Sequence, residues 1–450
     1  MVEKKVSSKD ARSALVQQSL LNFFSSRLDF GNEVCVAFSG GCDSVVLLHA
    51  LNELCHRGDL AVSLSALHVH HGISSNANAW TAFCEEFCSV HTIPLAVHRV
   101  CVANNSGKGL EAAARNARYA VFKECRAHWL ALAHHQDDQV ETVLLNLLRG
   151  AGIIGVAGMP AERTLSLRLR LVRPLLDMPR ELIKEYAYRH HLQWVDDESN
   201  LDSRYRRNFL RNEIIPKLAE HFPKAQGALA RAARHFAEGA KLLDELAIID
   251  HKALASPAGR VLLAGFNALD PAKARNLLRF IWQDAGFQMS EARWIEEAMR
   301  QLAATKNDSE TCVATADGEL HVYRGEIYLR SHRPAPVKAI SWQGEEFLPW
   351  ADGKVYFKSV KGQGLNLGQL QKYGATLQPR QGGEQLHLHP KRPRKSLRNL
   401  FQETAIPPWE RERLPFLWCG KKLAWVGRIG MDVSFACSPT DDGILPVWEG

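Results

Sequence analysis

The stretch that decides the fold is Val34-Cys35-Val36-Ala37-Phe38, followed directly by Ser39-Gly40-Gly41-Cys42-Asp43-Ser44. The five apolar residues predict a buried strand, and the apolar residues 45–48 predict the start of a helix. The two glycines let backbone N–H groups close on an anion at the positive end of that helix. We therefore predict a phosphate-binding turn between strand and helix, rather than an ordinary glycine-rich turn.

The chemistry of this turn differs from that of a Walker loop. A Walker loop carries a lysine that holds the β and γ phosphates, whereas Asp43 stands near that place here. An acidic residue indicates a Mg²⁺ ion on a leaving pyrophosphate. We expect the loop to bind ATP through these residues: Ser39, Gly40, Gly41, Cys42, Asp43 and Ser44.

Length and composition set broad limits on the protein. A chain of 450 residues predicts about three domains. The net charge of +7 permits a polyanionic partner without requiring one. The ten cysteines lack zinc-type spacing and fit a reducing compartment, so we expect a cytoplasmic protein. No apolar segment predicts secretion or a membrane span.

The order of strand and helix patterns predicts an α/β fold with a parallel sheet. Apolar runs at 34–38, 64–69, 95–100 and 129–133 alternate with helical patterns, which places ligands at the carboxyl ends of the strands. We expect this domain to cover residues 1–210. A mainly helical domain at 211–333 and a small α+β domain at 339–450 follow.

Histidines and arginines near the expected strand ends are candidate ligand contacts. His68 and His70 share one face of a strand, where nucleotide binding is favoured over zinc because no third metal ligand follows. Arg115 and Arg118 lie three apart on one helix face and repel each other unless an anion lies between them. An ordinary solvated helix face explains Arg118 about as well, but Arg115 less well.

Further acidic residues lie where the fourth expected strand leads into a helix. Asp137 and Glu141 are four residues apart and share a helix face. If this strand lies beside the first, Asp43 and Asp137 hold one Mg²⁺ between them. Asp138 is explained equally well as an anion at a helix N-terminus.

Two basic stretches are typical of nucleic-acid contacts. Four arginines lie within eight residues beside an aromatic side chain: Arg204, Arg206, Arg207 and Arg211. In the stretch 391–398, five of eight residues are basic, which suits a phosphate backbone better than a folded core.

These motifs, in this order, resemble those of the bacterial tRNA(Ile)-lysidine synthetases, members of the PP-loop ATP pyrophosphatase superfamily. The resemblance rests on SGGCDS at 39–44, HHG at 70–72, AAARNARY at 112–119, AHHQDDQVET at 133–142 and DESNLDSRYRRNFLR at 197–211. RQGGE at 380–384 and IPPWER at 406–411 extend it to the end of the chain. The SGGCDS loop alone resembles that of the whole superfamily, whereas the IPPWER and HHQDDQVET segments make the resemblance specific to the tRNA(Ile)-lysidine synthetases.

The resemblance implies that the protein joins free L-lysine to the wobble cytidine of the tRNA(Ile) with a CAU anticodon, through an adenylated cytidine. It implies a catalytic set of Asp43, Arg115, Asp137, Glu141 and Arg207, with His70 at the nucleotide. Asp137 and Glu141 are both candidates for the base that deprotonates lysine. A homodimer is left open.

The resemblance also implies that the last domain reads the acceptor stem, and we expect these residues to contact tRNA: Arg204, Arg206, Arg211, Arg380, Arg392, Arg394, Lys395 and Arg398. Two alternatives remain. A PP-loop tRNA thiolation enzyme needs reactive cysteines, for which Cys84 and Cys88 are the only close pair. A tRNA-binding protein without catalysis is disfavoured by the presence of Asp43 and Asp137.

Overall fold

The computed structural model describes residues 8–102, 110–287, 292–305, 311–315, 317–331 and 338–449. The chain forms two compact units, Met1–Glu245 and Leu246–Gly450, and the division falls inside the long helix α10 (Ala225–Leu254). Pro334 and Pro336 predict a connector at residues 332–336, which lies outside the described residues.

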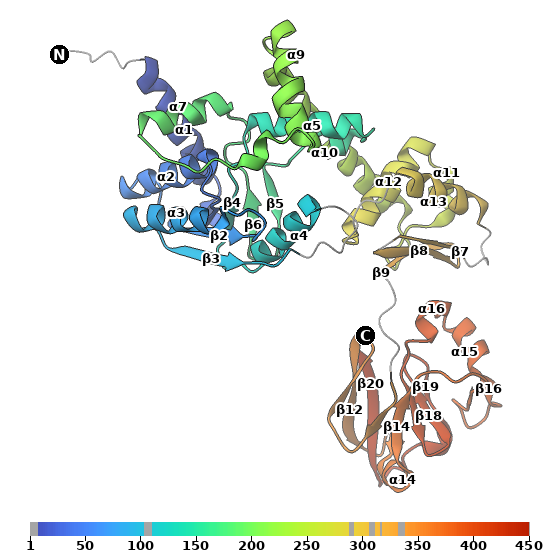
Figure 1. Cartoon of the computed structure of the whole chain (residues 1–450). Helices are drawn as coiled ribbons and strands as arrows, with labels where there is room; N and C mark the ends of the chain where they lie inside the picture. The colour runs from blue at the N-terminus through green and yellow to red at the C-terminus, as the bar shows by residue number, and fades with distance from the viewer. Residues whose placement is uncertain are drawn as a thin grey trace. The chain divides into compact units, whose positions relative to one another are not determined.

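The first unit is built on a six-stranded sheet in the order β3-β2-β1-β4-β6-β5 (Figure 1). Its strands are β1 (Glu33–Ala37), β2 (Ser63–His70), β3 (Leu95–Arg99), β4 (Trp129–Ala131), β5 (Glu162–Thr164) and β6 (Arg170–Val172). All neighbours are parallel except β5, which runs antiparallel to β6. The chain moves outward from β1 to β3 and then crosses back to β4, so the order reverses between β1 and β4. Open α/β sheets bind ligands at such a reversal.

Helices surround this sheet. They are α1 (Ser8–Ser25), α2 (Cys42–His56), α3 (Ala77–Val90), α4 (Leu110–Lys123), α5 (Gln136–Leu148), α6 (Ile153–Val156), α7 (Arg180–Arg189), α8 (Arg206–Phe209), α9 (Ile215–His221) and α10. Short turns are η1 (Leu28–Phe30), η2 (Glu198–Leu201) and the π-helical η3 (Leu210–Ile214).

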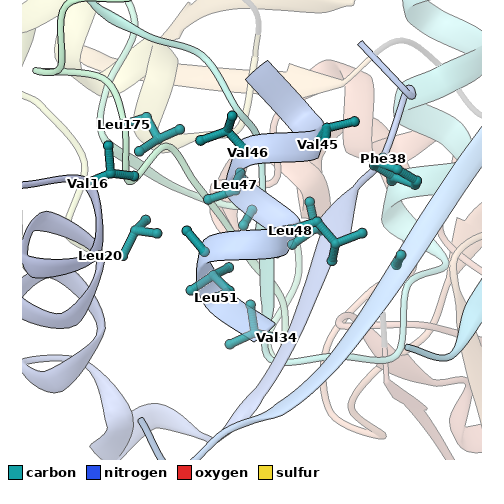
Figure 2. Close-up of a cluster of buried hydrophobic side chains, with 14 of the residues drawn as sticks. Val16, Leu20, Val34, Phe38, Val45, Val46, Leu47, Leu48, Leu51 and Leu175 are labelled. Atoms are coloured by element: carbon teal, nitrogen blue, oxygen red, sulfur yellow. The ribbon is translucent and has the colours of Figure 1, made fainter. Parts of the chain in front are cut away.

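Alternate residues of each strand pack on opposite faces of the sheet, as the strand period requires. Val34 and Val36 of β1 join a core with α1, α2 and α7, whereas Cys35 faces Val121 and Phe122 of α4. Figure 2 shows the first core, in which the apolar start of α2 lies among residues from α1, β1 and the segment after β6. A helix that is apolar nearly all round is thereby buried, which holds the preceding glycine loop at the sheet edge.

The second unit begins with helices that pack on a three-stranded sheet. After α10 come α11 (Leu263–Ala268), α12 (Pro271–Asp284) and α13 (Ala292–Ala304). They share a core with one face of the antiparallel sheet β7 (Thr311–Ala314), β8 (Gly318–Tyr323) and β9 (Glu326–Ser331).

The rest of the second unit holds two larger antiparallel sheets, in the orders β10-β14-β17-β18-β19 and β11-β12-β20-β13, and the two-stranded antiparallel sheet β15-β16. The first contains β10 (Ile340–Trp342), β14 (Ala375–Gln378), β17 (Phe416–Cys419), β18 (Lys422–Val426) and β19 (Gly430–Met431). The second contains β11 (Phe347–Trp350), β12 (Gly353–Lys361), β13 (Leu365–Asn366) and β20 (Asp442–Glu449). Smaller elements are β15 (Gln385–Leu386), β16 (Lys395–Ser396), η4 (Val433–Phe435), α14 (Leu367–Tyr373), α15 (Leu397–Glu403) and α16 (Pro408–Arg411).

These elements confirm the predicted fold class: a parallel-sheet domain, then helices, then a mixed α and antiparallel β region. The division into three domains at 211 and 339 remains a proposal. Among the described residues, the structure contains no helix with the length and apolar character of a membrane span.

Candidate active site

The phosphate loop joins β1 to α2 at the reversal of the sheet. Gly40 has φ of +83°, and a Cβ there would lie 3.0 Å from Val195 Cγ2 and 3.1 Å from Cys84 Sγ. Both the conformation and the space therefore require glycine. Ser44 Oγ donates to Gly41 O at 2.9 Å and lies 3.2 Å from Ser39 Oγ, so the two hydroxyls close the turn. No side chain caps the start of α2 within the described residues, which leaves its N–H groups for an anion.

Asp43 lies at the first turn of α2, beside two basic side chains. Its Oδ2 is 3.5 Å from Nε2 of the buried His135, and its Oδ1 is 3.5 Å from Nε of Arg180. Burial alone would raise the pKa of Asp43, but His135 and Arg180 outweigh it and lower that pKa. Asp43 is therefore ionised at neutral pH.

The segment after β4 brings further carboxylates to His135. Asp138 Oδ2 accepts from the His135 backbone N–H at 3.1 Å and lies 3.3 Å from its Nε2, while Asp137 Oδ1 is 3.9 Å from Nδ1. Burial would lower the pKa of His135, but Asp43, Asp138 and Asp137 together raise it. The three neighbouring carboxylates thus favour the charged form of the His135 ring.

Glu141 lies one turn further along α5, and both of its carboxylate oxygens accept hydrogen bonds from arginines. Its side chain is 1% exposed, and it accepts from Arg207 Nε at 2.6 Å and from Arg211 Nε at 2.5 Å. Arg211 also donates to Asp138 Oδ1 at 2.9 Å. Because Arg207 and Arg211 are four residues apart, one helical turn of spacing aims both guanidiniums at Glu141. Arg211 belongs to the π-helical turn η3, a feature that is frequent at functional sites.

Two carboxylates, those of Asp43 and Asp137, are candidate ligands for a Mg²⁺ ion. Within the described part of the chain, Asp43 Oδ1 is buried and accepts no hydrogen bond. The Asp137 oxygens accept weak bonds of 3.2 Å from Arg180 N and 3.4 Å from Gln226 Nε2. Carboxylate oxygens are the ligands that Mg²⁺ prefers.

A cavity of about 590 Å³ opens beside the phosphate loop. It combines loop residues with aromatic side chains (Trp80, Tyr188 and Trp194) and basic ones (Arg118, Arg180, Lys184 and Arg211). The predicted residues that line it are Ser39, Gly41, Cys42, Asp43, Ser44 and Arg211. Its size and lining suit a nucleotide.

For two residues that were predicted to contact the nucleotide or phosphate, His70 and Arg115, a nearby residue lines the cavity instead. His68 and His71 line it, whereas His70 bonds Asn78 Oδ1 at 3.1 Å and is outside its lining. His68 and His70 do share one strand face, since both bond residues of α3. Arg118 lines the cavity, whereas Arg115 lies over the Tyr119 ring with its guanidinium carbon 5.0 Å from the centroid.

The remaining predicted tRNA contacts of the first unit lie at the surface. Arg204 is 89% exposed and pairs with Asp202, and Arg206 is exposed at the start of α8. Their positions are compatible with a phosphate backbone, and their roles stay predictions.

Some of the basic residues predicted to contact tRNA in the second unit lie beside acidic side chains, and others are exposed to solvent. Arg394 lies 3.6 Å from the buried Asp432, and Lys395 donates to Glu403 at 2.7 Å. Arg380 lies 3.8 Å from Glu384 and over the Phe401 ring. Arg392 and Arg398 are exposed.

Comparison with known proteins assigns the chain to a family. The PP-loop domain family matches residues 13–218, the TilS substrate-binding domain 262–328 and the TilS substrate C-terminal domain 375–448. A tRNA(Ile)-lysidine synthase of Nitrosomonas europaea is 41% identical over 93% of this chain and 92% of its own. The chain belongs to the tRNA(Ile)-lysidine synthase family.

A second curated relative agrees with this assignment. The tRNA(Ile)-lysidine synthase of Aromatoleum aromaticum is 42% identical over 92% of this chain and 97% of its own. Among solved structures, a U34-tRNA thiolase from Methanococcus maripaludis aligns with a TM-score of 0.42 and 19% identity, over 53% of this chain and 85% of its own. That similarity is too low to support an argument about activity.

Three residues that lie at this site were not predicted from the sequence of this tRNA(Ile)-lysidine synthase family member. His135 and Arg180 contact Asp43, and Lys184 lines the cavity. His135 lies within the quoted AHHQDDQVET motif, between a strand end and two aspartates, which was a usable signal. Arg180 and Lys184 carried no such signal, because they come from α7 and reach the site only in the fold.

Proposed function

We propose that the protein uses ATP to join L-lysine to the wobble cytidine of the tRNA(Ile) that carries a CAU anticodon. The observation that carries this proposal is the position of Asp43, directly after a phosphate loop and with one carboxylate oxygen that accepts no hydrogen bond within the described residues. This geometry supports pyrophosphate release from ATP, and family membership indicates the substrate.

Adenylation comes first, because the O2 of cytosine is a poor leaving group until it is activated. O2 attacks the α-phosphorus of ATP, the bond to the β-phosphate breaks, and pyrophosphate leaves. The backbone N–H groups at the start of α2 and the two serine hydroxyls of the loop hold the departing anion. Asp43 and Asp137 would hold Mg²⁺, which supplies charge stabilisation on the pyrophosphate when bound.

Lysine transfer follows. The ε-amine of lysine has a reference pKa near 10.4 and must lose a proton before it attacks C2 and releases AMP. Asp137 and Glu141 are both proposed for the base and for binding the ammonium group. Geometry favours Asp137, since the Glu141 oxygens are held by two arginines. Glu141 then positions Arg207, which with Arg115 contacts phosphate and the flipped cytosine.

Selection of the tRNA falls to parts of the chain outside the catalytic loop. The same anticodon occurs in isoleucine and methionine tRNAs with CAU, so the base alone cannot distinguish them. Arg204, Arg206 and Arg211 are proposed contacts near the anticodon, and the second unit is proposed to read the acceptor stem. The proposed contacts are Arg392, Arg394 and Arg398, which are exposed, together with the half-buried Arg380 and Lys395.

A cytoplasmic location fits this function, because tRNA, ATP and lysine meet there. All ten cysteines are free thiols, which suits a reducing compartment. Whether two copies form a homodimer is left to a sedimentation measurement.

The strongest competing function is tRNA thiolation. It requires a reactive thiolate, and the close pair Cys84 and Cys88 is buried in the core at 0% and 2% exposure. Burial raises their pKa values to about 12 and about 11, so both stay thiols. The double variant Cys84→Ala/Cys88→Ala should retain lysine transfer. A folded double variant without any tRNA modification would favour thiolation.

The experiment for the proposed function is ATP–pyrophosphate exchange measured with and without the isoleucine tRNA. We expect exchange that depends on this tRNA and continues without lysine, because adenylation precedes lysine attack. A tRNA-binding protein without catalysis would show tRNA binding and no exchange.

A further inference from the structure

The sheet β7-β8-β9 has one face that does not pack against α11, α12 and α13. Residues of β8 alternate in burial, with Leu320 and Val322 in the core and Glu319, His321 and Tyr323 on the opposite face. In the strand register, Cys312 of β7 is the direct partner of His321, and Arg330 of β9 is the direct partner of Glu319. Chemically reactive side chains from three strands therefore share this face.

The Glu319 carboxylate and the Cys312 thiol both lie near the same ring nitrogen of His321. His321 Nε2 lies 2.9 Å from Glu319 Oε2 and 3.9 Å from Cys312 Sγ. The sulfur, nitrogen and oxygen donor atoms all lie within 4.8 Å of one another. A single ion at their centre would contact all three, since tetrahedral zinc sites place each ligand about 2.0–2.3 Å from the metal.

The surroundings favour a fixed but accessible site. Trp409 of α16 packs on the His321 ring, with centroids 4.5 Å apart and planes at 30°, which holds the ring in place. Glu319 is 15% exposed and lies 3.9 Å from Arg330, so its orientation is also held. Cys312 is exposed, which provides a path for an ion to enter.

We propose that Cys312, Glu319 and His321 bind a divalent transition-metal ion, with Zn²⁺ as the best fit. A mixed thiolate, imidazole and carboxylate set matches zinc and excludes Mg²⁺, which prefers oxygen ligands alone. On binding, the proton of the Cys312 thiol and any proton on His321 Nε2 are released to solvent, and the metal takes the place of these protons. The thiolate and the carboxylate then balance the two positive charges of the ion. Three protein ligands leave a fourth position for water.

The site has a structural consequence within the second unit. The ion would join β7 to β8 and orient the His321 ring on which Trp409 packs. Around this ring, Tyr328 also lies against Trp409 with centroids 5.2 Å apart, and Arg411 of α16 reaches Tyr323. Metal binding therefore reinforces the contact between the three-stranded sheet and α16. This proposal is independent of the activity proposed above.

The test is the alkylation rate of individual cysteines in the full chain, with excess Mg²⁺ present and with or without Zn²⁺. Peptide mass mapping separates Cys312 from Cys101, which is also exposed but belongs to the other unit. We expect Zn²⁺ to slow alkylation of Cys312 at least tenfold and to leave Cys101 unchanged. Equal rates at Cys312 with and without Zn²⁺, or equal protection of Cys101, would overturn the proposal.

Two variants and a spectroscopic probe sharpen the result. Glu319→Gln should raise the Zn²⁺ concentration that half-protects Cys312 by about 10–100-fold, the loss of metal affinity that removal of a partner residue causes. His389→Gln, at an exposed histidine elsewhere in the unit, should leave that concentration unchanged. Co²⁺ should give a thiolate-to-cobalt absorption band that Cys312→Ser abolishes. A band that persists in Cys312→Ser would show that another thiol binds the ion.

Discussion

Arg207 on α8 donates a hydrogen bond of 2.6 Å from its Nε to Oε2 of Glu141 on α5. Glu141 is 1% exposed, and Arg211 occupies its other oxygen. The two residues were both expected at the catalytic centre, but the structure shows them as partners of each other. This relationship supports the proposal that Glu141 positions Arg207 while Asp137 acts as the base.

The Glu141→Gln and Asp137→Asn variants should therefore differ. Glu141→Gln removes one partner of a buried ion pair and should lower the free energy of unfolding by about 3 kcal/mol. Asp137→Asn should unfold near wild type but lose lysine transfer to tRNA that is already adenylated. Urea unfolding and single-turnover lysine transfer measure the two effects, with Glu220→Gln at an exposed position as the control. Full lysine transfer in Asp137→Asn would contradict its role as the base.

Asp43→Asn should abolish adenylation without unfolding the protein. A neutral amide cannot balance Mg²⁺ beside pyrophosphate, and Asp43 is not part of the apolar core. ATP–pyrophosphate exchange with tRNA present is the measurement, and Asp59→Asn at an exposed position of the same unit is the control. Normal exchange in Asp43→Asn would remove Asp43 from the metal site.

Stability of the second unit should fall at acid pH through Asp432. This side chain is 1% exposed; burial would raise its pKa, but hydrogen bonds from Ser434 and the His387 N–H outweigh that and lower it. A lowered folded-state pKa gives stability that is present above the unfolded value of about 3.9 and is lost as pH falls through the folded value. Asp432→Asn should cost about 2 kcal/mol at pH 7, and the difference from wild type should shrink below about pH 4. Urea unfolding across this pH range measures it, and a constant difference would contradict the prediction.

Arg392→Gln/Arg398→Gln should weaken tRNA binding and flatten its salt dependence. Each phosphate contact that is lost should reduce the slope of log affinity against log salt by about 0.9 for duplex nucleic acid. Lys421→Gln/Lys422→Gln neutralises two exposed residues of the same unit and serves as the matched control. Binding isotherms at several salt concentrations measure the slope. Equal slopes for both double variants and wild type would exclude Arg392 and Arg398 as contacts.

The sequence predicted the parts of this structure that depend on local pattern. The strand, loop and start of α2 follow one another within eleven residues, and each has a strong local signal. The hairpin of β5 and β6 was missed, although residues 165–171 alternate apolar and polar side chains. A Mg²⁺ site shared by Asp43 and Asp137 was predicted only if β1 and β4 are neighbours, and the structure confirms that the two strands pair.

The parts of the site that could not be predicted depend on distant residues. Arg180 reaches Asp43 from 137 positions along the chain, and Arg211 reaches Glu141 from 70. No local periodicity reports such contacts. The sequence analysis favoured Arg115 over Arg118 as a ligand contact, although both lie on one helix face. The fold shows instead that Arg118 lines the cavity and Arg115 does not.

The most direct test of the central claim is incorporation of radiolabelled lysine into tRNA by the purified full chain with ATP and Mg²⁺. Two transcripts with the same CAU anticodon are compared, one from isoleucine tRNA and one from methionine tRNA. The account predicts lysine incorporation into the isoleucine transcript, with matching release of AMP and pyrophosphate, and little into the methionine transcript. No incorporation into the isoleucine transcript, by a folded protein that binds both ATP and tRNA, would contradict it.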